Sequence, residues 1–428
     1  MENCLSLFEE QKMNVVDYLQ KRGIIDAMTH EDLSQHFDSP RRVYAGFDPT
    51  ADGLHLGNFA IIMRLCQFQR MGHTPVVLLG GATALVGDPS GKSLERPLLD
   101  LHQVKENLKG IKAELSRFID PENAIFINNY DWFESVSFIT FLRDVAKNFR
   151  VGPMLAKESV KVRLQSNEGM SFTEFSYQLL QAYDFLQLYD HYGVCTQIGG
   201  SDQWGNITAG TELIRKQRAK SAYGITFPLL SRSDGKKFGK SEEGTIWLSK
   251  DKLSPYHFYQ YLLRVPDKDV GQLLRFLTFL ELEEIIQLEN DCKSGKLHPS
   301  DLQKKLASEV CRIVHGNAGL EEALEATKGL YPASAENLDC KALEEMEIPK
   351  HQFERSDIIG KKIIEVAVIA KLFASKGEAR RMIRNGGVYF NNNRLEDEEL
   401  VVEAENLLQD QYLLLAAGKR KKVLVKLA

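Results

Sequence analysis

The chain has 428 residues, 43% of them hydrophobic, and a formal net charge of −5. A chain of this length is expected to fold into two or three domains with a sizeable core. The acidic balance excludes a protein that coats nucleic acid non-specifically, because such binding needs Lys and Arg spread over the surface, so any RNA binding must be local.

The six cysteines are scattered without a close pair, which favours neither a zinc site nor a disulfide framework and fits a reducing compartment. The N-terminus, with Glu2, Glu9 and Glu10, lacks the basic start of a secretory signal and the acid-poor composition of a transit peptide. No apolar stretch reaches the length of a membrane span. We therefore expect a cytoplasmic protein that does not interact with membranes.

Four short apolar runs without alternation, each followed by turn or glycine residues, predict buried parallel strands at residues 43–47, 75–79, 124–128 and 194–198. Helical patterns separate them, as at residues 56–71 and 100–118. This alternation predicts an α/β domain with a Rossmann-like, doubly wound parallel sheet. Ligands of such a sheet gather at the carboxyl ends of its strands.

From about residue 254 to about 330 the pattern is helical throughout, which predicts an all-α unit. Prolines and a loss of periodicity indicate a linker after it. The last segment has the pattern of two helices followed by short strands, typical of a small α+β domain. We therefore expect domains at residues 1–230, 231–335 and 361–428, with a linker at 336–360.

Two motifs about 180 residues apart have the composition of ATP-polyphosphate sites. His55-Leu56-Gly57-Asn58 lies where a strand gives way to a helix, so that backbone N–H groups and the helix dipole favour an anion. Lys237-Phe238-Gly239-Lys240-Ser241 places two lysines in a polar segment that can close over a triphosphate. Taken alone, each also fits a simpler interpretation: a chance His-Xaa-Gly, or a solvated lysine face.

One predicted helix carries polar side chains on an otherwise apolar surface. Tyr177, Gln181 and Asp184 are spaced i, i+4 and i+7, which brings them onto one face. This face either lines a polar pocket or forms a hydrogen-bonded network in the core. Asp88 and Asp202 each follow a predicted strand in a short loop, where a carboxylate can enter the crevice; Asp88 alone could equally cap a helix.

The two motifs, in this order, resemble the nucleotide-binding sequences of class I aminoacyl-tRNA synthetases. Other segments narrow the resemblance to tyrosyl-tRNA synthetases of the bacterial and organellar type, over nearly the whole chain. These segments are YAGFDPTAD (44–52), GGAT (80–83), GDPSGK (87–92), FTEFSY (172–177), QAYD (181–184) and GGSDQWGN (199–206).

The resemblance implies a tyrosine–tRNA ligase that forms tyrosyl-adenylate and pyrophosphate from L-tyrosine and ATP, then transfers tyrosine to the 3′-terminal adenosine of tRNA(Tyr). Mg²⁺ would arrive with ATP, and no protein-bound metal is expected. The resemblance also implies a homodimer, for which residues 132–149 and Phe172 offer apolar surface. DNA is not an expected partner.

Catalysis in this family is positioning plus stabilisation of charge on the leaving pyrophosphate. The residues that would serve the polyphosphate are Thr50, His55, Asn58, Lys92, Arg96, Lys237, Lys240 and Ser241. Asn58 is a departure, because the family has a second histidine there; an amide N–H can occupy nearly the same position. The residues that would reach the adenosine and phosphates of ATP are Gly46, Asp48, His55, Gly57, Gly200, Asp202 and Lys240.

By the same resemblance, Tyr44 and Asp184 would meet the phenolic hydroxyl of tyrosine. Asp88, Tyr177 and Gln181 would hold its ammonium group, with Gln203 near its carboxylate. The C-terminal segment resembles a small RNA-binding domain shared with a ribosomal protein. Its expected RNA contacts are Lys376, Arg380, Arg381, Arg384, Lys419, Arg420, Lys421 and Lys422, although a basic tail can also be merely solubilising.

Two other classes of protein share part of these features. A tryptophanyl synthetase or another adenylate-forming enzyme would share the ATP motifs but lack the paired Tyr44 and Asp184. A pure RNA-binding protein would rest on the C-terminal domain alone, and retention of both ATP motifs argues against it.

Overall fold

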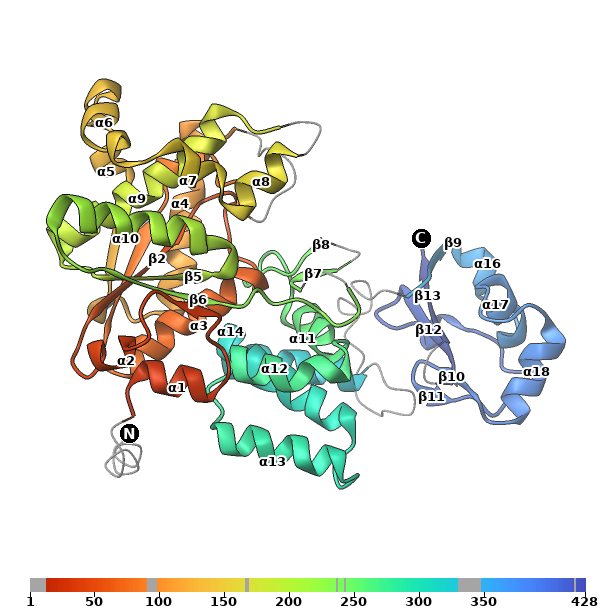
Figure 1. Ribbon diagram of the computed structural model, residues 1–428. Helices are drawn as coiled ribbons and strands as arrows, with labels where there is room; N and C mark the ends of the chain where they lie inside the picture. The colour runs from red at the N-terminus through yellow and green to blue at the C-terminus, as the bar shows by residue number, and fades with distance from the viewer. Residues whose placement is uncertain are drawn as a thin grey trace. The chain divides into compact units, whose positions relative to one another are not determined.

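The computed structural model describes residues 13–90, 98–165, 169–235, 238–241, 244–329, 348–418 and 421–428. The chain forms two compact units (Figure 1). One comprises Met1–Lys252 with Arg264–Leu306, and the other comprises Leu253–Leu263 with Ala307–Ala428.

The first unit is built on a six-stranded sheet in the order β1-β6-β5-β2-β3-β4. Its strands are β1 (Ala27–Met28), β2 (Arg42–Phe47), β3 (Thr74–Leu79), β4 (Ile125–Asn128), β5 (Thr196–Gly200) and β6 (Tyr223–Phe227). All neighbours are parallel except β1 and β6. The chain adds β3 and β4 on one side of β2 and then β5 and β6 on the other, so the order reverses between β2 and β5. This confirms the predicted doubly wound sheet.

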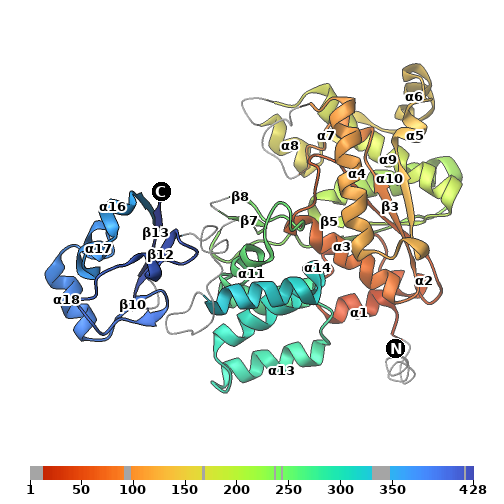
Figure 2. The same ribbon diagram turned by 180° about the vertical axis from the view of Figure 1, so that it is seen from behind.

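Helices cover both faces of this sheet. Figure 1 shows α9 (Phe172–Tyr192) and α10 (Trp204–Arg218) on one face, and the view from behind in Figure 2 shows α3 (Leu56–Arg70) and α4 (Leu101–Phe118) on the other. On the α9 side, Phe185 and Leu188 pack against Tyr44 and Val76 of the central strands in one buried cluster. The remaining helices before residue 240 are α1 (Val15–Lys21), α2 (Leu33–His36), α5 (Tyr130–Phe133), α6 (Phe138–Asp144), α7 (Val151–Leu155) and α8 (Glu158–Leu164).

The predicted helical region is confirmed. Its helices are α11 (Pro255–Leu263), α12 (Asp267–Leu277), α13 (Leu282–Lys293) and α14 (Pro299–Gly329), preceded by the short strand pair β7 (Lys240–Ser241) and β8 (Gly244–Thr245). Gly316 interrupts α14 with a left-handed φ of 74°. No helix within the described ranges is long and apolar enough to cross a membrane.

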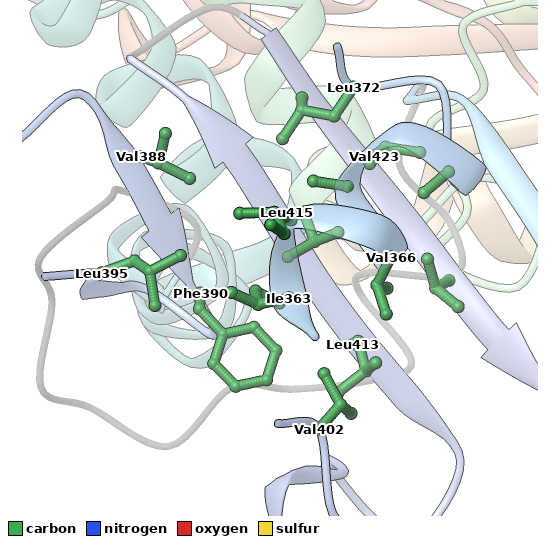
Figure 3. Packing of buried hydrophobic residues seen from close by; sticks show 14 of the residues in the cluster. Ile363, Val366, Leu372, Val388, Phe390, Leu395, Val402, Leu413, Leu415 and Val423 are labelled. Atoms are coloured by element: carbon green, nitrogen blue, oxygen red, sulfur yellow. The ribbon is translucent and has the colours of Figure 1, made fainter. Parts of the chain in front are cut away.

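The C-terminal part of the second unit is a small α+β fold, as predicted. Its sheet has the order β11-β10-β12-β13-β9, with β9 (Lys350–Phe353), β10 (Val388–Phe390), β11 (Asn393–Arg394), β12 (Tyr412–Ala417) and β13 (Lys421–Leu427). Its helices are α16 (Arg355–Ile358), α17 (Ile363–Ile369) and α18 (Lys376–Arg384). Figure 3 shows Ile363 and Val366 packed against the sheet residues Leu413, Leu415 and Val423.

Some element boundaries differ from the prediction for local reasons. In the C-terminal segment, the apolar pattern continues to Phe373, but α17 ends at Ile369, since Lys371 adopts a left-handed φ of 58°. The strand expected at 194–198 lies at Thr196–Gly200, so two glycines that resemble a turn belong to the strand. Residues 350–353, within the range expected as linker, pair with β13.

Candidate active site

The predicted substrate residues gather where the strand order reverses. Asp48 follows β2, Asp202 and Gln203 follow β5, and α9 presents Tyr177 and Asp184 from the neighbouring layer. In open α/β sheets the crevice outside the carboxyl ends of the strands at such a point is the usual ligand site. α9 can present its polar stripe because it runs unbroken for 21 residues, from the Ser171 N-cap to the left-handed Gly193.

Asp184 is buried at 2% exposure and is held by two donors. The Asn129 amide donates to its Oδ2 (3.1 Å) and the Trp132 indole N–H donates to its Oδ1 (2.9 Å). Burial raises the pKa of this carboxyl well above its usual range, although both hydrogen bonds act in the opposite direction. Each oxygen retains a second lone-pair site, so the carboxyl can accept one further hydroxyl.

Tyr44 is fully buried beside this carboxyl. Its ring packs edge-on against Phe185 at 5.1 Å between centroids. Within the described part of the chain its hydroxyl has no hydrogen-bond partner. Burial raises the pKa of Tyr44 well above its usual range, with the nearby Asp184 charge adding to the effect. A buried hydroxyl without a partner costs free energy in the empty site, and a ligand group can supply that partner.

A second carboxylate network begins at Asp48. It accepts hydrogen bonds from the Tyr177 hydroxyl (2.8 Å, Oδ2) and from the Thr83 hydroxyl (2.8 Å, Oδ1). Asn129 donates to Thr83 Oγ1 (2.9 Å) as well as to Asp184, so the Asp48 and Asp184 networks are joined. Burial, followed by the Asp48 charge, raises the pKa of Tyr177 and keeps it a neutral donor.

A third network holds the amide and acid side chains nearer to α10. Gln203 Nε2 donates to Asp88 Oδ2 (2.8 Å), and Gln181 Nε2 donates to Gln203 Oε1 (3.2 Å). Asn206 Nδ2 lies within hydrogen-bonding distance of Gln181 Oε1 (3.0 Å) and of Ser90 Oγ (3.2 Å). Asp88 also accepts the Ser90 backbone N–H (2.9 Å), which is the local turn bond expected of an Asp in a loop.

The first ATP motif begins α3, as predicted. His55 is the N-cap, and its Nδ1 accepts the backbone N–H groups of Gly57 (3.1 Å) and Asn58 (3.3 Å). A neutral imidazole in this arrangement carries its proton on Nε2. Asn58 completes a capping box, because its Oδ1 accepts the His55 backbone N–H (3.1 Å). The amide oxygen of Asn58 is therefore used in the cap, and its Nδ2 keeps the donor expected at this position.

The second ATP motif packs directly against the first. Leu56 N–H donates to Ile246 O (2.8 Å), Ile246 N–H donates to Gly239 O (3.0 Å), and Leu248 N–H donates to Leu54 O (2.9 Å). Gly239 has a φ of +80°, and a Cβ added to it would lie 3.0 Å from the Gly57 nitrogen. Only glycine satisfies both requirements. Folding thus brings the two motifs together at the positive end of α3.

The structure describes part of the predicted RNA-binding surface of the C-terminal fold. Arg380 and Arg381 of α18 are exposed, whereas Lys376 pairs with Glu365 (2.6 Å) and Arg384 pairs with Glu398 (2.8 Å). Lys421 is exposed with its Nζ 5.7 Å from the Phe373 ring centroid, and burial lowers the pKa of Lys422. Lys419 and Arg420 lie outside the described residues.

The comparisons with known proteins agree with this geometry. Residues 36–332 match the family model of class I tRNA synthetases (W and Y), and residues 341–425 match that of the tyrosine–tRNA ligase SYY-like C-terminal domain. A tyrosine–tRNA ligase of Protochlamydia amoebophila is 54% identical, over 97% of this chain and 99% of its own length. The chain belongs to the tyrosine–tRNA ligases.

Other relatives point to the bacterial and organellar type. The chloroplastic/mitochondrial tyrosine–tRNA ligase of Arabidopsis thaliana is 50% identical over 97% of this chain and 84% of its own length. Among solved structures, a C-terminally truncated mitochondrial tyrosyl-tRNA synthetase of Aspergillus nidulans is 29% identical with a TM-score of 0.64. The match covers 74% of this chain and 94% of that one.

Several residues that complete the site of this tyrosine–tRNA ligase were not predicted: Thr83, Ser90, Asn129, Trp132 and Asn206 hold the predicted ones in place. Asn129 could have been found, because it follows β4 at the edge where Asp88 and Asp202 were expected. Predicted residues that lie outside the described ones are Lys92, Arg96 and Lys237. Among the described residues, no group of three His, Cys, Asp or Glu side chains could hold a metal ion.

Proposed function

We propose that the crevice between β2 and β5 binds L-tyrosine and ATP and forms tyrosyl-adenylate. The chain is a tyrosine–tRNA ligase. In the proposed reaction, a tyrosine carboxylate oxygen attacks the α-phosphorus, the bond from that phosphorus to the bridging oxygen breaks, and pyrophosphate leaves. Tyrosine then passes to the 3′-terminal adenosine of tRNA(Tyr), with release of AMP.

The observation that carries the choice of tyrosine is the buried pair of Tyr44 and Asp184. A substrate phenol can donate to Asp184 and accept from the otherwise unpartnered Tyr44 hydroxyl. Phenylalanine would leave the Tyr44 hydroxyl without an acceptor and the Asp184 carboxyl with only its two protein donors, Asn129 and Trp132, in a dry pocket. Tyrosine-specific synthetases are themselves the general example of this effect, with phenylalanine rejected by roughly 10⁴–10⁵.

The amino-acid end of the substrate would lie over the amide and acid network. Asp88 and Gln181 offer acceptors for the ammonium group, together with the Tyr177 hydroxyl, and Gln203 lies beside Asp88 for the carboxylate end. Asp48 and Asp202, with the glycines Gly46 and Gly200, would face the adenosine. The hydrogen bonds among these side chains support the assignment because they place the polar atoms before the substrate arrives.

The polyphosphate would lie at the junction of the two ATP motifs. The α3 N-terminus, Thr50 and the His55 Nε2–H are donors, and Lys240 supplies positive charge, with Lys237, Lys92 and Arg96 expected to add to it. Mg²⁺ would enter with ATP as part of the substrate. Lysines and fixed N–H groups aimed at the leaving pyrophosphate lower the barrier because its charge grows in the transition state.

The C-terminal α+β fold would hold the tRNA through Arg380, Arg381 and Lys421 on its surface. Arg380→Gln with Arg381→Gln should lower aminoacylation while leaving tyrosine-dependent pyrophosphate exchange unchanged, because the adenylate site is untouched. A matched control is Lys371→Gln, which removes an exposed lysine outside the predicted contacts. Wild-type aminoacylation by the double variant at physiological salt would contradict the RNA role of these arginines.

The first unit exposes an apolar surface suited to a homodimer. Phe138 (66%) and Ile139 (70%) of α6 and Phe172 (71%) of α9 are exposed, which large apolar side chains usually are not. Ile139→Glu with Phe172→Glu should shift the protein from dimer to monomer in sedimentation velocity. A wild type that sediments as a monomer would contradict the proposal. We expect the protein to act in the cytoplasm.

Pyrophosphate exchange with each of the twenty amino acids tests the substrate directly. Tyrosine alone should support exchange, and tryptophan should not, although one family model covers both synthetases. Exchange with tryptophan at a rate comparable to tyrosine would exclude the proposed role of Tyr44 and Asp184.

A further inference from the structure

One face of α4 contacts the loop that carries Thr50 and leads to His55. Asn107 Nδ2 donates to the Pro49 carbonyl (2.9 Å) in a buried contact, with Asn107 itself 2% exposed. Seven residues further along α4, Glu114 Oε2 accepts the Leu54 backbone N–H (2.7 Å), also buried. The two side chains therefore hold both ends of residues 49–54, because positions i and i+7 lie on the same face of a helix.

Between these two contacts the helix and the loop touch through their backbones. A Cβ added to Gly110 would lie 2.4 Å from the Asp52 carbonyl oxygen, closer than atoms can approach. Gly110 sits within α4, where glycine costs about 1 kcal/mol relative to alanine. The close approach is a physical reason for glycine at this position: it lets the loop lie directly on the helix.

The opposite side of the same loop is held by the segment after the second ATP motif. Leu248 N–H donates to Leu54 O (2.9 Å), and Lys252 pairs with Asp52. Leu54 is thus fixed through its N–H by α4 and through its C=O by the residue 246–252 segment. Because His55 is the next residue, the position of its imidazole is determined by these two bonds together with the cap.

We propose that Asn107 and Glu114 are positioning residues for the polyphosphate site, which set the places of Thr50 and His55 without touching ATP themselves. This inference rests on the proposed function, since it assumes that Thr50 and His55 serve the polyphosphate. Glu114 is suited to the task because a buried carboxyl oxygen is a strong acceptor of a backbone N–H. Its burial also raises the pKa of the carboxyl, while the Leu54 bond acts in the opposite direction.

The test compares Glu114→Ala with Glu114→Gln. Alanine removes the acceptor for Leu54, whereas glutamine keeps a carbonyl oxygen that can accept the same N–H. We expect Glu114→Ala to lower kcat/KM for ATP in pyrophosphate exchange by about 10–100-fold, with tyrosine binding in the absence of ATP changed less than about twofold. Glu114→Gln should restore most of the ATP activity. Glu106→Ala, on the exposed side of α4, is the matched control and should behave as wild type.

Gly110→Ala is an independent variant, because it keeps the Glu114 bond and displaces the Asp52 carbonyl. It should also lower kcat/KM for ATP and spare tyrosine binding. Wild-type ATP kinetics in Glu114→Ala or, if that variant does not fold, in Gly110→Ala would overturn the proposal. Equal losses of tyrosine and ATP binding, without rescue by glutamine, would also overturn it, because they would show a merely structural role. Failure of the proposed function is separable, since the wild type would then not exchange with tyrosine.

Discussion

Tyr44→Phe should make the ligand-free protein slightly more stable and the enzyme less selective. The substitution removes a single oxygen from a fully buried ring whose hydroxyl has no partner among the described residues. The ring and its edge contact with Phe185 stay in place. In the empty site the hydroxyl only costs free energy, so its loss is favourable; in the tyrosine complex it would donate to the substrate, so its loss is unfavourable.

The size of both effects follows from hydrogen-bond energetics. A neutral hydrogen bond contributes about 0.5–1.5 kcal/mol net, so kcat/KM for tyrosine should fall by about 2–13-fold. Phenylalanine cannot pair with the Tyr44 hydroxyl, so its activation should stay level or rise. Removing an unsatisfied buried hydroxyl should stabilise the free protein by about 1 kcal/mol, which raises Tm by about 2 °C or less in a chain of this size.

Pyrophosphate exchange with tyrosine and with phenylalanine, and thermal unfolding without ligands, measure these quantities. Tyr177→Phe is the contrasting variant, because the Tyr177 hydroxyl donates to Asp48 (2.8 Å). Its removal should lower Tm, since the half-buried Asp48 carboxylate loses a donor. An unchanged tyrosine-to-phenylalanine ratio in Tyr44→Phe would refute the role of this hydroxyl in recognition. A lower Tm would refute the inference that the hydroxyl is unsatisfied in the free protein.

Three further outcomes are expected. Lys240→Ala and Lys237→Ala should each slow adenylate formation by roughly 10²-fold, about 3 kcal/mol, and leave tyrosine affinity unchanged. Wild-type rates in stopped-flow measurements would show that these lysines do not stabilise the charge of the leaving pyrophosphate. Asn58→His should keep activation within about tenfold, whereas Asn58→Ala should lose roughly 1–3 kcal/mol in kcat/KM, and equal activity of all three proteins would mean that the position makes no contact with ATP. Burial, followed by the charges of Arg41 and His73, lowers the pKa of His36 to about 4. The folded state therefore binds fewer protons than the unfolded state, and stability should fall as pH drops from about 6.5 towards 4. His36→Gln should flatten this pH dependence of the free energy of unfolding in chemical denaturation, and an unchanged slope would count against it.

Four strands of the sheet in the first unit were predictable because buried parallel strands leave continuous apolar runs, whereas β6, which also lies inside this sheet, was not predicted. The strands predicted near β2, β3, β4 and β5 are all present in the sheet. The edge strand β1 was missed because two residues, Ala27 and Met28, give no pattern to detect. β9 was missed because His351 and Phe353 alternate with polar residues over only four positions, which local sequence cannot distinguish from a loop.

The grouping of candidate residues was predictable where one element carries several of them, as the polar stripe of α9 does. It was less predictable where tertiary packing assigns a role. Trp132 was expected only as part of an apolar surface, yet its indole N–H is bonded to Asp184. Asn58 was expected as a phosphate donor, and its oxygen proves to close the α3 cap. Such bonds join residues far apart in sequence or depend on side-chain direction, and local periodicity encodes neither.

The proposed selectivity of this site for tyrosine would depend on residues that no motif identifies. Rejecting phenylalanine requires that Asp184 cannot find another partner when the phenol is missing, and therefore that its surroundings cannot relax. Asn129 meets this requirement, since it is fully buried and fixed by the Ala82 N–H to its oxygen (2.7 Å) and by its own backbone N–H to Leu79 (3.0 Å). Its amide is committed to Thr83 and Asp184. The proposed acceptor for the phenol is thus part of a rigid network anchored at the ends of β3 and β4. With phenylalanine bound, that network cannot move to supply Asp184 with a third donor or the Tyr44 hydroxyl with an acceptor.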